Sequence, residues 1–432
     1  MNRPTKLARG LAILALGLTI GACGQCGPAP TRVASTSETS TSAGKLVVPE
    51  VQFPVNGRSP WQPGGVEGPG GPSIIASANF TALATSGGVF TVPPSWLSIS
   101  CATTGRTVQT SASTIVSGIG ANAWRARNVG SGLGLSVESA RENTDPYGVT
   151  GAASWTLGGA TAVNATGPDG STNTAATVTW TTGTSVLGYA AGLGSGAPYI
   201  ASFWEIDTGG TRTIGFLDQF TGTPTTVIST AITWGRYQLS WGSAAPADLA
   251  WGTWAGAPNP NGQGTVWGAQ IETGRYPSSV IPTAGTAASR AADVLSTTSA
   301  IAPSGRLNMT AVVAPNFASG EQGVDSPILW WNSTNQIFLQ QSTGKIVIEL
   351  GGVAALVSAA LTWSREQAIT VAAHLAPSGA LSLTVSGATT GNGTTNATGV
   401  GTFSTGATSY LLGTSSGAQE CADLRSVSFA AP

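Results

Sequence analysis

From about residue 72 onward, the chain is a series of short segments in which apolar and polar residues alternate. Typical segments are "PYIASFWEID", "GKIVIELGG" and "LRSVSFAAP", and turns rich in Gly, Ser and Asn separate them. Alternation with a period of two places apolar side chains on one face of a β-strand, and no helical pattern of about 10–15 residues intervenes. The sequence therefore predicts an all-β fold of antiparallel β-sandwiches rather than an α/β fold.

The composition excludes several other classes of protein. Only 9% of the residues are charged and 59 are Gly, which excludes a coiled coil. The 14 Trp residues, together with Val, Ile and Leu along the chain, provide the apolar surface that a disordered chain lacks. The net charge is −1, so we expect no nucleic-acid partner.

The 432 residues are enough for two domains that each bury a core. Residues 23–74 are rich in Ser, Thr, Pro and Gly, a composition typical of a flexible tether. A Thr-, Ala- and Ser-rich stretch ends near residue 298, and a second series of strand-like segments follows it. We therefore predict one β-sandwich over residues 75–298 and another over residues 299–432.

Residues 1–22 have the features of an export signal. Arg3, Lys6 and Arg9 precede an apolar run that is too short for a comfortable membrane span. The run ends in "IGAC", which resembles a bacterial lipobox and would make Cys23 the lipidated mature N-terminus. Ile and Gly are less usual choices in that motif, so ordinary signal cleavage remains an alternative. We expect an exported protein, an outer-membrane lipoprotein or a cell-surface protein, that meets the membrane only through its lipid anchor.

Export would place the other cysteines in an oxidising compartment. Three remain, Cys26, Cys101 and Cys421, so one is left over from any pairing. Cys101 and Cys421 both lie in strand-like segments, and we predict a disulfide between them. The alternative is that each is a small buried thiol. The single histidine argues against a Cys/His metal site.

Several motifs between residues 80 and 298 occur in a recognisable order. They include "GLGLSVESARENTD" (132–145), "WGRYQLSW" (234–241) and "VWGAQIETGRYPSSVIPTAGTAASRAADVLS" (266–296). Together they resemble the β-sandwich module of bacteriophage tail-fibre and head-spike proteins. The resemblance implies adhesion, or the building of a fibre. Virion proteins carry no lipoprotein signal, so we interpret the chain as a bacterial protein that reuses the module.

Residues 299–432 resemble a concanavalin A-like or laminin-G-like sandwich on more generic grounds. Such a domain often follows the first module in the phage proteins. Some laminin-G-like domains hold Ca²⁺, and Glu321 and Asp325 in "SGEQGVDSP" would be its ligands here. Apart from this Ca²⁺, the sequence implies no cofactor.

Sugars stack on aromatic rings while polar side chains fix their hydroxyl groups, so tryptophans with polar neighbours are candidate ligand-binding residues. Adjacent residues of a strand point to opposite faces, so one of the two tryptophans in "LWWNSTNQ" should be exposed. Core and edge packing is the alternative for each. The candidates are Trp251, Trp254, Trp330, Trp331, Asn332 and Asn335.

Catalytic motifs are incomplete in this sequence. Glu205 and Asp207 would share a strand face, a spacing that resembles the E-x-D core of β-sandwich glucanases. The third acid of that motif is missing, because the residues after Asp207 are Thr, Gly, Gly and Thr. His374 lies in an alternating segment, and no G-x-S-x-G motif accompanies it. We therefore expect no enzyme, and we expect the acidic pair to be a solvated strand edge.

The charged residues of the phage-like motifs are expected to be structural, because buried charges need partners. Glu138 and Arg141 would fix a strand-to-loop corner. Glu272, Arg290 and Asp293 would hold the closing segment through hydrogen-bonded ion pairs.

The segment "WGAQIE" is expected to bury one face of a strand. Period-two alternation places Trp267, Ala269 and Ile271 together on that face.

These observations predict a non-catalytic adhesion or carbohydrate-binding protein displayed on a bacterial envelope, with a glycan or another cell-surface ligand as its partner. A structural fibre or envelope component without a small ligand is the alternative, with its domains serving an oligomer. A glycoside-active enzyme is the third hypothesis.

Overall fold

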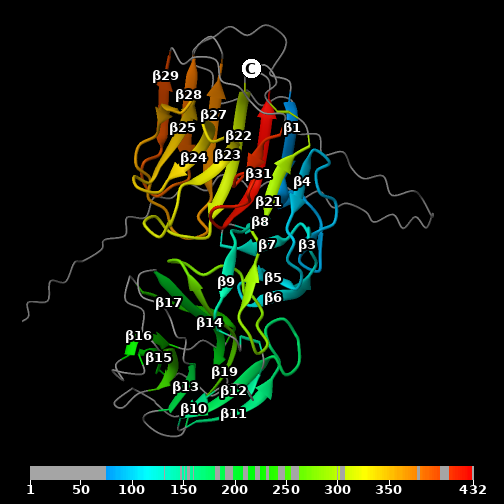
Figure 1. The fold of residues 1–432 in the computed structure, drawn as a ribbon, viewed down its shortest axis with the longest axis vertical. Helices are drawn as coiled ribbons and strands as arrows, with labels where there is room; N and C mark the ends of the chain where they lie inside the picture. The colour runs from blue at the N-terminus through cyan, green and yellow to red at the C-terminus, as the bar shows by residue number, and fades with distance from the viewer. Residues whose placement is uncertain are drawn as a thin grey trace, which may run out of the picture. The chain divides into compact units, whose positions relative to one another are not determined.

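The computed structural model describes residues 74–130, 132–145, 148–149, 151–152, 156–158, 160–180, 185–189, 198–207, 213–218, 224–229, 233–241, 249–253, 262–298, 300–301, 307–376, 380–398 and 408–430. These residues form an all-β protein, which confirms the predicted fold class (Figure 1). The single helical element among them is a 3₁₀ turn, η1 (Phe80–Ala82). None of the helices in this described part is long and apolar enough to cross a membrane.

An eight-stranded antiparallel sheet contains the first and last described strands of the chain, β1 and β31, which pair with each other. Its central order is β29-β28-β27-β22-β31-β8-β7, with β1 on β31 (Figure 1). The strands are β1 (Ile74–Asn79), β7 (Ala126–Val129), β8 (Gly132–Val137), β22 (Leu307–Pro315), β27 (Ile369–Leu375), β28 (Leu381–Ser386), β29 (Gly393–Ala397) and β31 (Ala422–Ala430).

A seven-stranded sheet has the order β26-β25-β24-β23-β30-β21-β4. Its strands are β4 (Leu97–Ser100), β21 (Val294–Thr297), β23 (Ser326–Asn332), β24 (Asn335–Gln340), β25 (Lys345–Leu350), β26 (Val353–Val357) and β30 (Tyr410–Leu411). Apolar residues of this sheet and of the eight-stranded sheet belong to one buried core, including Leu329, Ile337 and Ile348 with Leu135, Met309 and Val371. The two sheets therefore form a β-sandwich, and they take strands from both sides of residue 298.

Two five-stranded sheets come from the middle of the chain. The first has the order β11 (Ala160–Ala165), β12 (Ala175–Trp180), β19 (Gly262–Thr273), β14 (Tyr199–Asp207) and β17 (Gly235–Trp241). The second has the order β10 (Thr156–Gly158), β13 (Ser185–Tyr189), β18 (Leu249–Thr253), β15 (Thr213–Asp218) and β16 (Pro224–Ser229). Three two-stranded ribbons complete the strands: β2 (Thr85–Ser86) with β3 (Val89–Phe90), β5 (Arg106–Ser111) with β6 (Thr114–Ile119), and β9 (Arg141–Asn143) with β20 (Ala288–Arg290).

The strand β19 contains a bulge at Gly268, which corrects one expectation. Ala269 and Ile271 pack in one buried cluster with Phe203, whereas Trp267 packs in a different cluster with Trp204. The pairing register shifts at this point, and Gly268 has a φ of +65°, in the left-handed region. The extra residue reverses the alternation, so Trp267 does not share a face with Ala269 and Ile271.

A buried ion cluster joins segments that are far apart in sequence, and we name it the Arg125 cluster: Arg106, Arg125, Glu138, Arg290 and Asp293. Arg125 contacts both Glu138 and Asp293. Arg106 lies 2.7 Å from Asp293, and Arg290 lies 3.2 Å from Glu138. These contacts confirm the predicted ion pairs of Arg290 and Asp293, and they give Glu138 the fixed polar contacts expected of it.

The other two predicted structural charges are also held by hydrogen bonds. Glu272 accepts hydrogen bonds from the backbone N–H and the hydroxyl of Ser278. Arg141 donates to the carbonyl of Thr273 and lies over the ring of Tyr276, 4.9 Å from its centroid. Arg141 therefore has the fixed polar contacts that were predicted, whereas the contacts that the structure gives Glu272 are hydrogen bonds to Ser278 and Gln270 rather than an ion pair.

The predicted disulfide between Cys101 and Cys421 is wrong, because both are free, buried thiols. Cys101 follows the edge strand β4, where its sulfur lies 3.5 Å from the carbonyl of Ala291. Cys421 precedes β31 in the other sheet, and its sulfur lies 3.4 Å from the hydroxyl of Ser139. Burial raises the pKa of the Cys421 thiol, which keeps it protonated. Cys23 and Cys26 lie outside the described residues.

Candidate functional site

The outer face of the seven-stranded sheet carries a row of polar and aromatic side chains. The pairs are Ser98 with Ser296, Ser296 with Tyr410, Tyr410 with Trp330, Trp330 with Gln336, and Gln336 with Glu349. Residues directly opposite each other in neighbouring strands share a face, so these six side chains form one line across six strands. We name this line the aromatic row: Ser98, Ser296, Tyr410, Trp330, Gln336 and Glu349.

The alternating neighbours of the row point into the core. Leu295, Leu411, Leu329, Ile337 and Ile348 are paired in the same way, and all are buried. The sequence forms this arrangement because each strand alternates apolar with polar or aromatic residues. The core row therefore fixes which side chains the sheet presents outward.

Two aromatic rings lie at the centre of the row. Trp330 and Tyr410 contact each other edge to face, with ring centroids 5.4 Å apart and an interplanar angle of 67°. Both side chains are half-buried, whereas Trp331 is buried in the core. The prediction that one of the two adjacent tryptophans faces outward is confirmed, and Trp330 is that residue.

Polar groups flank the rings. The Gln336 side-chain amide donates to a carboxylate oxygen of Glu349 at 2.8 Å, and both residues are half-buried. Ser98 is exposed and Ser296 is half-buried on the other side of Tyr410. An aromatic surface between hydroxyl, amide and carboxylate groups can stack on a sugar ring and exchange hydrogen bonds with its hydroxyl groups.

Asn332 and Asn335 hold the turn between β23 and β24. The Asn332 side-chain oxygen accepts hydrogen bonds from the Thr334 N–H at 3.0 Å and from the Asn335 amide at 2.9 Å. The Asn335 side-chain oxygen accepts from the Gly351 N–H at 3.0 Å. The structure gives both asparagines a role in the turn and does not bring them into the aromatic row.

Trp251 and Trp254 are far from this row in the chain. Trp251 lies in β18, where it is opposite Leu187 of β13 and Phe216 of β15 in the pairing register. Trp254 lies outside the described residues. The structure therefore does not place Trp251 in the aromatic row.

The two predicted Ca²⁺ ligands are engaged with the protein itself. Glu321 forms an ion pair with Arg365 at 2.5 Å and accepts a hydrogen bond from the Ala318 N–H. Asp325 accepts from the Gln341 N–H at 2.7 Å. No group of three or more His, Cys, Asp or Glu residues that could hold a metal ion occurs within the described ranges. Ca²⁺ binding stays a prediction.

The acidic pair at residues 205 and 207 is not the solvated strand edge that we expected. Glu205 is buried, with 1% of its surface exposed, and its strand β14 is flanked by both β19 and β17. The side chain of Asp207 lies outside the described part of the structure. Glu205 is therefore a buried residue of a central strand, not a solvated residue of an edge strand.

His374 lies in β27, opposite Asn308 of β22, and its ring contacts the Asn308 side chain. Burial lowers the pKa of His374, so its neutral form is favoured. The contact with an amide is a structural one, and it gives the ring no acidic partner of a catalytic triad.

Sequence analysis missed five members of the row: Ser98, Ser296, Tyr410, Gln336 and Glu349. Each stands at an outward position of an alternating segment, and that alternation is visible in the sequence. The missing information was the pairing, since β30 comes from the end of the chain and lies between β23 and β21.

No family model matches this chain, and no curated protein matches it. The resemblance to the phage module therefore stays a prediction. Solved structures give low similarity. The Ca²⁺-bound exoplasmic/lumenal domain of VIP36 is 13% identical, with 32% of this chain and 73% of that chain covered and a TM-score of 0.24.

Two other solved structures cover more of this chain. The N-terminal tandem CBM22 domains of a Paenibacillus barcinonensis protein are 10% identical and cover 69% of this chain and 98% of that chain, with a TM-score of 0.24. A carbohydrate esterase from the Shiga toxin-encoding bacteriophage phi24B is 13% identical and covers 64% and 89%, with a TM-score of 0.16. Likenesses of this degree leave the function of this chain to be argued from its own residues.

Proposed function

We propose that this is a non-catalytic carbohydrate-binding protein and that the aromatic row is its glycan-binding surface. The observation that carries the proposal is the half-buried pair of Trp330 and Tyr410 on an outward sheet face. Aromatic rings supply apolar contact area, and the neighbouring Gln336 and Glu349 supply donors and acceptors for hydroxyl groups. A row of aromatic and polar side chains across six strands suits an extended sugar chain better than a small molecule.

We further propose that the protein is exported and displayed through Cys23, as the lipobox-like sequence suggests. Display on an envelope would make glycan binding an adhesive function. The resemblance to the phage module supports the same role, because that module implies adhesion.

The proposal is tested with a glycan array and then by calorimetry with the oligosaccharide that binds best. We expect Trp330→Ala to weaken binding at least about tenfold, about 1.4 kcal/mol, as for aromatic residues at the centre of an interface. Trp330→Phe should retain part of the affinity. Val163→Ala is the matched control, because Val163 is an exposed apolar residue on β11, in a different sheet.

Unchanged affinity in Trp330→Ala, with the protein folded by circular dichroism, would contradict the aromatic row as the site. If no glycan binds the intact protein, the alternative of a structural envelope component is favoured. Glycan hydrolysis that disappears in Glu205→Gln would instead favour the enzyme hypothesis.

A further inference from the structure

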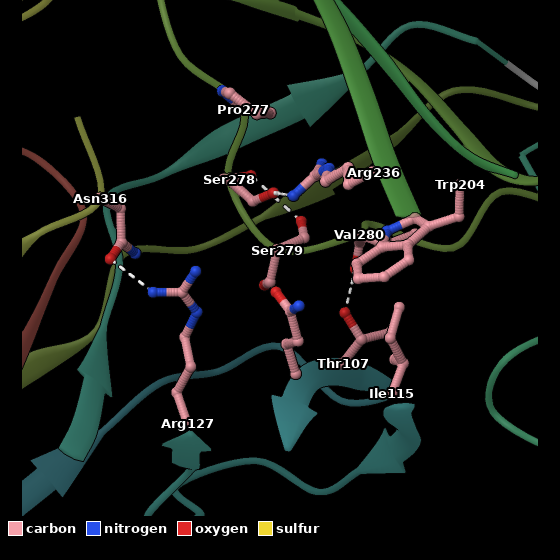
Figure 2. Close-up of a pocket in the computed structure, with 11 residues that line it drawn as sticks. Thr107, Ile115, Arg127, Trp204, Arg236, Pro277, Ser278, Ser279, Val280 and Asn316 are labelled. Atoms are coloured by element: carbon pink, nitrogen blue, oxygen red, sulfur yellow. Dashed lines mark hydrogen bonds between the residues drawn. The ribbon is translucent and has the colours of Figure 1, made fainter. Parts of the chain in front are cut away.

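A narrow crevice lies apart from the aromatic row, where β5, β7, β14, β17 and the loop 277–280 converge (Figure 2). Two of its lining residues are charged, and both are arginines, Arg127 and Arg236. Trp204, Ser278 and Asn316 contribute further walls. The free space has room for about one or two water molecules.

The two arginines differ in how their charge is balanced. Arg127 lies 2.9 Å from Asp423, contacts Glu366, and donates to the side chain of Asn316 at 2.7 Å, a bond drawn in Figure 2. Its charge is therefore matched by two carboxylates.

Arg236 donates to the carbonyl of Ser278 at 2.5 Å and to the hydroxyl of Ser202 at 2.9 Å, both neutral groups. Among the residues that the structure describes, no carboxylate lies within ion-pair distance of Arg236. Burial lowers the pKa of Arg236 to about 10, which Glu272 partly offsets and Arg127 reinforces. The side chain therefore stays a cation at neutral pH.

Trp204 supplies the second observation. It pairs directly with Arg236 across β14 and β17, so the two side chains leave the sheet on the same face. Trp204 is 1% exposed and lines the crevice, and its indole N–H has no acceptor within the described residues. The Nε–H of Arg236 likewise has no acceptor among the described residues. Indole and guanidinium groups only donate hydrogen bonds, so a partner for both must be an acceptor.

We propose that this crevice binds a carboxylate group, held between the Arg236 guanidinium and the Trp204 indole N–H. A carboxylate is planar and presents two acceptor oxygens, which suits a narrow space beside a guanidinium fork. Phosphate and sulfate are tetrahedral and bulkier. The carboxylate belongs either to a free small organic acid or to an acidic sugar such as a uronic acid. This inference does not rest on the proposed glycan site, because it involves different residues.

The probes are acetate, glucuronate and, as the neutral control, glucose, titrated into the ¹⁵N-labelled full chain. The indole N–H signal of Trp204 is assigned by its loss in Trp204→Phe. We expect acetate and glucuronate to shift this signal to saturation and glucose to leave it unchanged. Arg236→Gln should weaken the binding of both acids about tenfold or more. The matched control is Arg275→Gln, because Arg275 also donates to a carbonyl but lies outside the crevice.

The two acids distinguish the source of the carboxylate. Saturation by glucuronate at lower concentration than acetate supports an acidic sugar, and saturation by acetate alone supports a free small acid. The proposal is overturned if neither acid shifts the Trp204 signal, if sulfate shifts it equally, or if Arg236→Gln binds as Arg275→Gln does. Should Arg236→Gln not fold, loss of acetate binding in Trp204→Phe, followed by calorimetry, decides the same question.

Trp330→Ala keeps this test independent of the proposed function. It should abolish oligosaccharide binding at the aromatic row and leave the acetate titration of Trp204 unchanged.

Discussion

Arg125 is buried and Arg236 is half-buried, and the two guanidinium groups have different partners. Arg125 contacts two carboxylates, those of Glu138 and Asp293, within a cluster in which every arginine meets an acid. Among the described residues, Arg236 donates to a carbonyl and a hydroxyl and contacts no carboxylate. A buried charge is costly unless it is paired, so the first arrangement is what structural charges require.

The partners of the two arginines indicate a structural role for Arg125 and a binding role for Arg236. The Arg125 cluster ties together residues that are far apart in the chain, and each of its arginines contacts a carboxylate. Among the described residues Arg236 contacts no carboxylate, and the indole N–H of Trp204 beside it has no acceptor, which is a reason to admit a ligand. An arginine can therefore stabilise the fold or offer a binding site, and its partners determine which role it has.

The largest expected loss of stability comes from a substitution in the Arg125 cluster. Glu138→Gln leaves Arg125 and Arg290 without one of their carboxylates, and removing one partner of a buried ion pair costs about 3–5 kcal/mol of unfolding free energy. Urea denaturation measures this loss. Glu142→Gln, an exposed carboxylate on β9, is the matched control and should change stability by less than about 0.5 kcal/mol. A loss below about 1 kcal/mol in Glu138→Gln would show that the cluster is not a structural necessity.

A second effect is the pH dependence of the same cluster. Burial alone would raise the pKa of Glu138, but Arg125, Arg290 and the hydrogen bond from Ser279 outweigh it and hold that pKa well below its ordinary value of 4.5. Its contribution to stability is therefore fully present above pH 4.5 and is lost as the pH falls further.

The measurement is the difference in unfolding free energy between the natural protein and Glu138→Gln. This difference should be constant above about pH 5 and shrink below it by at most about 1.4 kcal/mol per pH unit. Asp293 faces the same arginines in both proteins, so its contribution largely cancels from the difference. A difference that grows on acidification would contradict the sign of the shift.

The smallest expected change in stability comes from a substitution of Arg236. Arg236→Gln removes a desolvated cation together with hydrogen bonds to neutral groups, so the unfolding free energy should change by no more than about 1 kcal/mol without ligand. Denaturation with and without acetate measures this. Acetate should stabilise the natural protein and not Arg236→Gln, because a ligand stabilises only the form that binds it. A loss as large as that in Glu138→Gln would remove the contrast between the two arginines.

Part of this structure was open to prediction from local pattern. Alternation identified the strands and the all-β class, and it also required one of Trp330 and Trp331 to face outward. The predicted ion pairs of Arg290 and Asp293 followed from the rule that buried charges need partners. These inferences rest on neighbours along the chain or on chemistry that holds wherever the residues lie.

The errors share a different cause. The Cys101–Cys421 bridge required a distance between two sheets, and the exposure of Glu205 required knowledge of which strands flank β14. Trp267 was placed on the wrong face because the bulge at Gly268 interrupts the alternation. Each of these depends on strand pairing, which the local pattern does not encode.

The sequence by itself therefore determined the type of element, the outward or inward preference of most side chains and the need for charge pairing. Only the tertiary structure decided which strands became neighbours, because pairing depends on contacts between segments that are distant in the sequence. That pairing brings Tyr410 beside Trp330 and makes a surface of two separate aromatic residues. It also sets Arg236 opposite Trp204 and gives both of them donors without acceptors in the described chain.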